Sequence, residues 1–217
     1  MIREIIKKPI IELMKAMDLY SLYLIRVGGV LKEDGWFRSF KEGRSIDSYG
    51  NPIPWLTYPA IDFIERRIRP DMCVFEFGCG ASTLWWAQRV KKVIACEHDS
   101  AWYQEVVRSI PANVSLHNIP LVYGGEYCRK VSGFVEKFDI VVIDGRDRVN
   151  CAKYAFNSLT PAGVIIWDNS DREEYLEGYE YLYLHGFRKI EFVGLAPIVN
   201  IKAETGIFYR PDNCFNI

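Results

Sequence analysis

The segment Val74–Thr83, "VFEFGCGAST", joins an apolar run to a glycine loop and carries one acidic side chain. Gly78 and Gly80 supply a backbone that adopts unusual torsion angles and lets a ligand lie against it. Ser82 or Thr83 is predicted to cap a following helix, whose free N–H groups attract an anionic group. The segment therefore predicts a ligand-binding turn between a strand and a helix.

The residues around the two glycines disfavour a phosphate ligand. A P-loop needs a lysine directly before its Ser or Thr, and no lysine follows Gly80 before the helix is under way. A dinucleotide-binding loop needs a third glycine, where this chain has Thr83. Glu76 ends the apolar run, and a buried carboxylate there repels a pyrophosphate and favours a cationic ligand.

A second acid follows the next apolar run in "VIACEHD", where Glu97 stands at the position from which an acid binds both ribose hydroxyls. A ligand with an amino acid group, a positive centre and a ribose meets all of these demands. The alternative is that Glu76 only caps a strand and that Glu97 is a surface acid.

These motifs resemble those of class I S-adenosylmethionine-dependent methyltransferases, with a likeness that extends over residues 55–210. "FEFGCGAST" is similar to their first motif and "CEHD" to their second, ribose-binding motif. The resemblance implies that Glu76 holds the methionine amino group and that His98 flanks the adenine edge, unless it only starts a helix. The implied cofactor-binding residues are Glu76, Gly78, Cys79, Gly80, Ser82, Thr83, Glu97, His98 and Thr57. Cys79 is a spacer in this loop, because no basic residue or second cysteine nearby activates its thiol.

Two further acids end later apolar runs, Asp144 in "FDIVVID" and Asp168 in "GVIIWDN", where Asn169 follows. Two carboxylates and an amide oxygen form a hard donor set that suits Mg²⁺ or another divalent cation such as Ca²⁺. The set resembles that of metal-dependent O-methyltransferases that act on catechols, caffeoyl thioesters and some macrolide sugars. The alternative is that these three residues cap helices and tie loops together without a metal.

The stretch "DGRDR" departs from the catechol-type enzymes, which carry a lysine base shortly after the first metal aspartate. Arg146 and Arg148 cannot replace that base, because a guanidinium stays protonated. We therefore expect Asp144, Asp147 or a metal-bound hydroxide to accept the proton. Arg146 or Arg148 is expected instead to bind an anionic substrate.

The elements that position these residues alternate between short apolar runs and helical spacing from residue 70 onward. Runs rich in Val, Ile and Phe are typical of parallel strands covered by helices on both faces. The predicted strands are 73–77, 92–97, 114–119, 138–144, 163–168, 188–193 and 204–209. The predicted helices are 83–90, 101–109 and 150–159, with a turn at 160–163. We expect an α/β, Rossmann-like doubly wound, mainly parallel seven-stranded sheet with an antiparallel last strand, plus an N-terminal helical cap.

Residues 1–59 are predicted to form N-terminal helices and an active-site cover loop, ahead of a catalytic domain at 60–217. The apolar spacing of the first 24 residues is typical of amphipathic helices, with a break near Pro9. We expect these helices to cover the sheet or a partner subunit, as in a homodimer. Peripheral contact with a membrane surface, or a role as a lid, is the alternative.

The stretch 35–59 is rich in glycine, proline and aromatic residues, which predicts an ordered loop. In the O-methyltransferases that the chain resembles, the corresponding loop touches both cofactor and substrate. The resemblance therefore implies substrate contacts from Trp55 and Tyr58 and a cofactor contact from Thr57.

Composition narrows the partners of this 217-residue chain. With 27 Lys and Arg against 28 Asp and Glu, the net charge of −1 predicts no nucleic acid partner. The six dispersed cysteines lack a C-x-x-C pair, which indicates a reducing, cytoplasmic compartment. The longest uncharged run near the N-terminus, residues 19–25, is too short for a transmembrane segment.

The predicted reaction is methyl transfer from S-adenosylmethionine to a hydroxyl oxygen of a small molecule or glycan. Two other functions remain open. An NAD-linked oxidoreductase shares Glu97 but needs glycine in place of Thr83. A non-catalytic subunit that binds an adenosyl ligand would use its N-terminal helices as the working surface.

Overall fold

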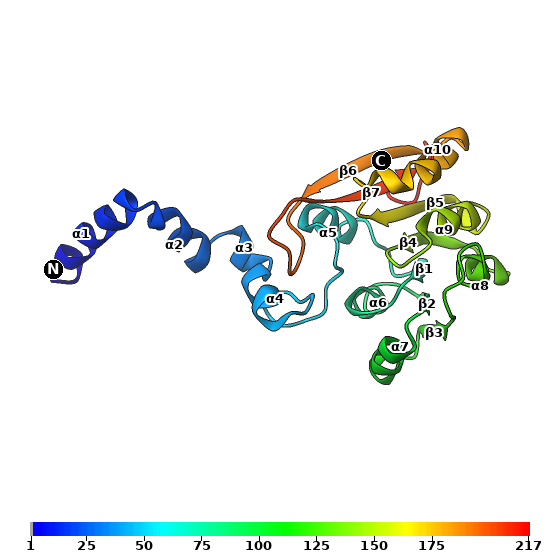
Figure 1. Cartoon of the computed structure of the whole chain (residues 1–217), viewed down its shortest axis with the longest axis horizontal. Helices are drawn as coiled ribbons and strands as arrows, with labels where there is room; N and C mark the ends of the chain where they lie inside the picture. The colour runs from blue at the N-terminus through cyan, green and yellow to red at the C-terminus, as the bar shows by residue number, and fades with distance from the viewer. Residues whose placement is uncertain (1) are drawn as a thin grey trace.

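The computed structural model describes residues 2–217, with side chains from residue 9 onward. A seven-stranded sheet lies between helices, and a helical arm extends away from it at the N-terminal end (Figure 1). The strands are β1 (Cys73–Phe77), β2 (Lys92–Glu97), β3 (Val114–Asn118), β4 (Phe138–Ile143), β5 (Leu159–Asp168), β6 (Arg188–Gly194) and β7 (Ala203–Tyr209). The helices are α1 (Ile2–Ala16), α2 (Leu19–Val27), α3 (Val30–Glu33), α4 (Trp36–Glu42), α5 (Tyr58–Glu65), α6 (Ala81–Ala87), α7 (Ser100–Val106), α8 (Glu126–Arg129), α9 (Arg148–Phe156) and α10 (Leu176–Leu184).

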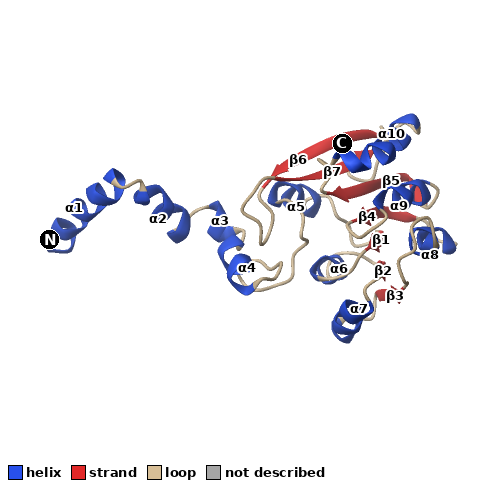
Figure 2. Ribbon diagram, in the orientation of Figure 1, coloured by secondary structure: helices blue, strands red, loops and turns tan. Residues whose placement is uncertain are grey.

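The strand order is β3-β2-β1-β4-β5-β7-β6, which confirms the predicted seven-stranded, doubly wound sheet (Figure 2). Strands β1 to β5 run parallel, and β7 runs antiparallel to both β5 and β6. The chain moves outward from β1 to β3 and then returns to β4 on the other side of β1. Ligands of such sheets bind beyond the carboxyl ends of the strands where this order reverses, which here is the edge formed by β1 and β4.

Both faces of the sheet are buried, because successive side chains of each strand point into two different cores. On β1, Val74 joins the core beneath α5 and α6, and Phe75 joins the core beneath α8, α9 and α10. Each of these two side chains is fully buried. Burial on both faces explains why the strands read as continuous apolar runs.

Some predicted element boundaries are wrong. Residues 160–163 do not form a turn, because β5 already begins at Leu159 and its register against β4 shifts between Phe138 and Ile140. Helix α6 begins at Ala81, so its N-cap position is Gly80; the predicted capping by Thr83 is confirmed in another form, because its hydroxyl accepts from the Gly80 N–H at 3.0 Å in a capping box.

The predicted break near Pro9 is also wrong, since α1 continues through this proline. The 35–59 stretch is a loop only in part, because α4 occupies its start and α5 begins at Tyr58. The domain boundary predicted between residues 59 and 60 therefore falls inside α5.

The N-terminal arm, defined here as α1 to α3, does not cover the sheet (Figure 1). Side chains predicted to form its buried face are instead exposed, with Leu13 61% and Met17 58% exposed. The side chains of Ile2 and Ile6, predicted on the same face, lie outside the described residues. Among the described residues, no helix combines the length and apolar character that crossing a bilayer requires. Contact of the arm with a partner subunit or a membrane surface stays a prediction.

The segment that follows the arm is tied to the body of the protein. The Trp36 indole donates to the Val199 carbonyl at 2.7 Å, across the loop between β6 and β7. The Ser39 hydroxyl bonds to the backbone of Ile46, and an isolated bridge joins Ile46 to Pro52. These contacts order residues 43–57 although they contain no helix or strand of their own.

Two glycines that flank α4 allow a matched test of this packing. Gly35 and Gly43 both have positive φ angles, +84° and +62°, but only Gly35 lies against the backbone of Asp47 and Ser48. We expect Gly43→Ala to cost about 1–2 kcal/mol from backbone strain alone. Gly35→Ala should lose about 1–3 kcal/mol more, because the loop must also move. Urea unfolding of both variants measures the difference, and equal losses would contradict the packing described here.

Candidate active site at the carboxyl edge of the sheet

Glu76 lies at the end of β1, where the strand order reverses, and its side chain is buried. Its Oε2 accepts a hydrogen bond from the Thr83 hydroxyl, which in turn accepts one from the Gly80 N–H at 3.0 Å. Its Oε1 makes no hydrogen bond within the described residues. Burial raises the pKa of Glu76 to about 7, and the hydroxyls of Ser82 and Thr83 oppose this rise. A buried acceptor without a donor is a place for a cationic donor of a ligand.

Glu97 ends β2 and is 4% exposed, which excludes the alternative of a surface acid. Its Oε1 accepts from the backbone N–H groups of His98 at 2.7 Å and Asp99 at 2.8 Å. Its Oε2 accepts from the Cys79 N–H at 3.2 Å and has no other partner within the described residues. The carboxylate is therefore oriented by the glycine loop and keeps acceptor capacity on one oxygen.

The glycine loop is held between the two acids. Gly78 has a φ of +99°, and its N–H donates to the Cys96 carbonyl at 2.8 Å. Burial raises the pKa of the Cys79 thiol, with the two nearby glutamates adding to the rise, so this thiol is unreactive as predicted. The Trp102 indole donates to the Cys79 carbonyl at 2.7 Å and leaves its ring 44% exposed beside the loop.

Asp144 and Asp168 meet at the ends of β4 and β5, as predicted from their position in the sequence. Burial raises the pKa of both carboxyl groups, and each lies within hydrogen-bonding reach of the other. The charge of Asp168 raises the pKa of Asp144 further, because two adjacent carboxylates resist ionising together. Asn169 follows in a left-handed conformation with a φ of +52°.

The sequence suggested an anion-binding role for Arg148, but it did not predict the structural role that this residue has in the site. Its buried guanidinium donates to the backbone carbonyls of Asp144, Gly145 and Asp168, and its Nη2 lies 3.4 Å from Asp144 Oδ1. It lowers the pKa of both aspartates against the effect of burial. The sequence gives no signal for this contact, because Asp144 precedes α9 and the four-residue spacing of helical pairs does not apply to it.

Asp147 and Arg146 lie beside this pair with different surroundings. Asp147 is buried at the start of α9, and its carboxylate accepts from the Gly124 N–H at 2.8 Å and the Asn150 amide at 2.7 Å. These bonds tie a loop and leave it poorly suited to act as a base. Arg146 is exposed, and its guanidinium has no hydrogen bond or ion pair to any described residue.

The three site residues predicted in the cover loop differ in exposure and in the elements that they contact. Trp55 is 48% exposed, whereas Tyr58 and Thr57 are buried. The Thr57 hydroxyl donates to the Phe192 carbonyl at 3.0 Å, so it faces β6. The Thr57 N–H donates to the Thr205 hydroxyl, which donates to Asp168 Oδ1 at 3.3 Å. Thr205, unpredicted from sequence, therefore connects this loop to the aspartate pair.

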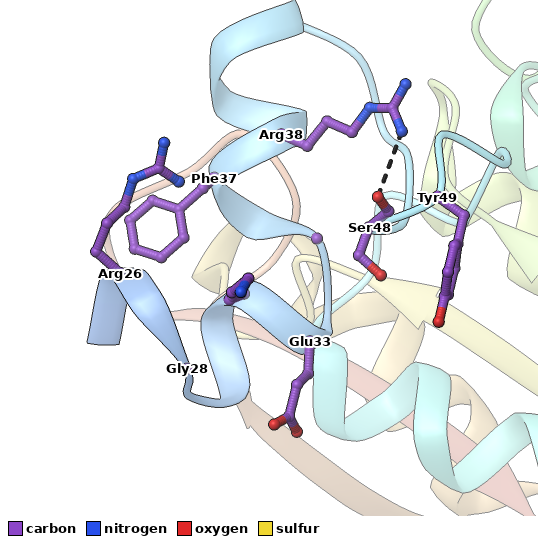
Figure 3. A pocket seen from close by; sticks show the side chains of 9 residues that line it. Arg26, Gly28, Glu33, Phe37, Arg38, Ser48 and Tyr49 are labelled. Carbon is purple, nitrogen blue, oxygen red and sulfur yellow. Dashed lines mark hydrogen bonds between the residues drawn. The ribbon is translucent and has the colours of Figure 1, made fainter. Parts of the chain in front are cut away.

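Two cavities lie near the residues described above. One, of about 550 Å³, is lined by residues that include Arg146, Asp147 and Arg148, and Arg148 also contacts Asp144. The other, of about 460 Å³, lies at the root of the N-terminal arm between Arg26, Phe37 and Tyr49 (Figure 3). There Arg38 donates to the Ser48 carbonyl, and no predicted site residue lines the cavity.

The pH dependence of stability tests the buried state of Glu76. Its pKa is raised from 4.5 to about 7, so the folded protein binds an extra proton between these pH values and loses stability as pH rises through them. The wild type should lose about 3 kcal/mol of unfolding free energy between pH 4.5 and 8, and the Glu76→Gln variant should not show this loss. Urea unfolding across this range measures the slope, with the exposed Glu105→Gln as a control that should follow the wild type. Identical slopes for all three proteins would contradict the assignment.

Comparisons with known proteins show similarity in sequence over part of this chain and in fold. Residues 75–170 match the family model of a methyltransferase domain. No curated protein sequence matches the chain significantly.

Three solved structures share the fold. The precorrin-6y C5,15-methyltransferase of Geobacter metallireducens superposes with a TM-score of 0.55 at 13% identity, over 70% of this chain and 88% of that one. An rRNA methylase of Streptococcus thermophilus gives 0.52 at 14% identity, over 72% and 99%. A Streptococcus mutans protein in complex with SAH gives 0.50 at 12% identity, over 68% and 94%. By sequence over residues 75–170 and by fold over most of its length, this chain is similar to methyltransferases.

Proposed function

We propose that the protein is an S-adenosylmethionine-dependent methyltransferase that methylates a hydroxyl oxygen of a small molecule or sugar. The observation that carries the proposal is the buried, unpaired Oε1 of Glu76 beside the glycine loop. Five acids gather at this edge of the sheet, namely Glu76, Glu97, Asp144, Asp147 and Asp168, and only Arg148 among the buried residues described there offsets their charge. An edge with this charge favours a cationic ligand over a pyrophosphate.

The residues fit each part of such a cofactor. Glu76 Oε1 is an acceptor for the amino group of the methionine moiety. Glu97 Oε2 is the acceptor for the ribose hydroxyls, and the bonds from the glycine loop hold it in place. The exposed ring of Trp102 offers an apolar surface beside the loop for the adenosyl group. When bound, S-adenosylmethionine supplies an activated methyl group, so the protein has to align the acceptor and take up one proton.

The aspartate pair can accept the proton that the acceptor hydroxyl loses during methyl transfer. A carboxylate whose pKa is raised by burial and by a like charge is a stronger base at neutral pH than a solvated one. Asp144, whose side chain is 27% exposed, is therefore the base we favour over the bonded Asp147.

A divalent cation is the second part of this proposal. Within the residues described, no three His, Cys, Asp or Glu side chains come together, so the donors available are Asp144, Asp168 and the amide of Asn169. Asp144 and Asp168 supply two facing carboxylate groups, and carboxylate oxygens are ligands that suit Mg²⁺. When bound there, the ion would lower the pKa of a coordinated hydroxyl group of the acceptor.

Two other functions account less well for the site. An NAD-linked oxidoreductase needs close approach of a pyrophosphate, where this chain has Thr83 bonded to Glu76. A non-catalytic subunit that binds an adenosyl ligand leaves the aspartate pair without a use. The rRNA methylase of similar fold acts on nucleic acid, whereas the net charge of −1 in this chain favours a small acceptor. A cytoplasmic location likewise stays a prediction.

Cofactor binding should depend on the ionisation of Glu76. Because the pKa of Glu76 is about 7, the affinity for S-adenosylhomocysteine should rise several-fold between pH 6 and pH 7.5. Glu76→Gln should bind more weakly and show no such rise. Isothermal calorimetry measures both, and an absence of binding at micromolar concentrations would remove the proposed function.

The aspartate pair should act after cofactor binding. Asp144→Asn should lower the rate of methyl transfer by roughly 10²–10⁴-fold while leaving the affinity for S-adenosylhomocysteine within about twofold. The readout is S-adenosylhomocysteine release over a pool of hydroxylated metabolites and glycans. A full rate in the variant would exclude Asp144 as the base.

We expect the rate of methyl transfer to depend on a bound divalent cation. A chelator is expected to reduce turnover, added Mg²⁺ to restore it, and Asp168→Ala to abolish that response. Turnover unaffected by both the chelator and the substitution would remove the cation from the proposal without touching the methyl transfer itself.

A further inference from the structure

The cavity of about 550 Å³ that Arg146, Asp147 and Arg148 line has the size of a small-molecule site. Its wall consists of the loop after β4, the first turns of α9 and the segment that follows β5, together with Tyr123 from the loop after β3. All of these segments follow the carboxyl ends of strands. The cavity therefore opens at the same edge of the sheet as the proposed cofactor site.

The charged side chains in this wall leave one cation without a partner. Lys153 is paired with Glu177 at 2.6 Å, and Asp147 accepts two hydrogen bonds within the wall. Arg148 is committed to three backbone carbonyls and to Asp144. Arg146 has no partner among the described residues.

A second arginine of the wall is only weakly engaged. Arg172 lies 3.8 Å from Glu174, with both side chains largely exposed at 48% and 63%. An exposed pair at this distance contributes little and readily yields to a better anionic partner. Arg146 and Arg172 can therefore both donate to an anionic group in the cavity.

The cavity is connected to the reacting groups through Arg148, which lines it and bonds to Asp144. Tyr175 forms a fixed wall, because its ring lies 5.4 Å from the Arg148 guanidinium and 5.8 Å from the Trp167 ring. Tyr123, 70% exposed, presents a second aromatic surface. Two aromatic surfaces suit the face of a ring-shaped acceptor.

The geometry points to an acceptor that carries a carboxylate or phosphate group, bound in this cavity with its anionic oxygens on Arg146 and Arg172. The inference rests on the proposed methyl transfer and narrows its substrate class from hydroxylated compounds in general to acidic ones. Planar guanidinium groups are well matched to both kinds of anion.

The test measures binding of three sugars to the full chain, with and without saturating S-adenosylhomocysteine, by calorimetry. Glucuronate and glucose 6-phosphate are the anionic probes, and glucose is the neutral one. We expect at least one anionic probe to bind and glucose to bind at least tenfold more weakly, and the better anionic probe identifies carboxylate or phosphate as the group recognised. Arg146→Gln should weaken that binding by roughly tenfold or more, since one charge-assisted hydrogen bond is lost.

Arg108→Gln is the matched control. Arg108 is exposed in the 3₁₀ turn after α7, a helix that begins just beyond β2 and so ends away from the carboxyl edge. It should bind all three sugars like the wild type, and neither substitution should change the affinity for S-adenosylhomocysteine. The inference is overturned if no anionic probe binds, if glucose binds equally well, or if Arg146→Gln behaves like Arg108→Gln. Binding of S-adenosylhomocysteine in those cases would leave the proposed function standing, whereas its absence would remove that function separately.

Discussion

The arrangement of the carboxyl edge depends on the contacts of Arg148. One buried guanidinium binds the carbonyl of Asp144, directly after β4, and that of Asp168, the last residue of β5, and it lies against the Asp144 carboxylate. Buried arginine is stable only when its donors are used, and here backbone carbonyls use most of them. The ends of two strands are thereby fixed at a set spacing, and with them the two carboxyl groups that face each other.

The same edge gathers more negative charge than it neutralises. Glu76, Glu97 and Asp168 are each less than 10% exposed, and Asp144 faces Asp168. Hydrogen bonds from the glycine loop and from Thr83 offset part of the cost, but they leave Oε1 of Glu76 without a donor. The protein therefore carries an electrostatic cost in its ligand-free form that a cationic ligand or ion relieves. This is the physical link between the fold and the proposed chemistry.

The features that the sequence predicted well depend on local patterns along the chain. The acids at strand ends and the glycine loop could be placed because a parallel sheet sends every carboxyl end to one edge, so that position along the chain implies position in space. Cys73–Phe77 and Lys92–Glu97 were predicted to the residue, since their burial on both faces produces uninterrupted apolar runs.

What the sequence did not predict depends on contacts between distant segments. Thr205 could not be recognised, because nothing in an isolated last strand indicates a bond to Asp168. The turn at 160–163 was wrong since Pro and Gly there mark a register shift within β5 rather than the end of an element. The N-terminal arm was predicted to bury its apolar face, and periodicity alone does not tell whether the covering surface belongs to the same chain.

The bonds from Thr57 through Thr205 to Asp168 bear on the order of assembly during synthesis. The cover loop precedes the first strand of the sheet, yet the Thr57 N–H donates to the side-chain hydroxyl of Thr205 in β7, the last of the seven strands to be synthesised. A nascent chain can pair β1 to β5 before that strand exists, but one hydroxyl donor to Asp168 and the anchor of the cover loop are then missing. The acceptor side of the site therefore stays incomplete until β7 has been synthesised and has joined the sheet.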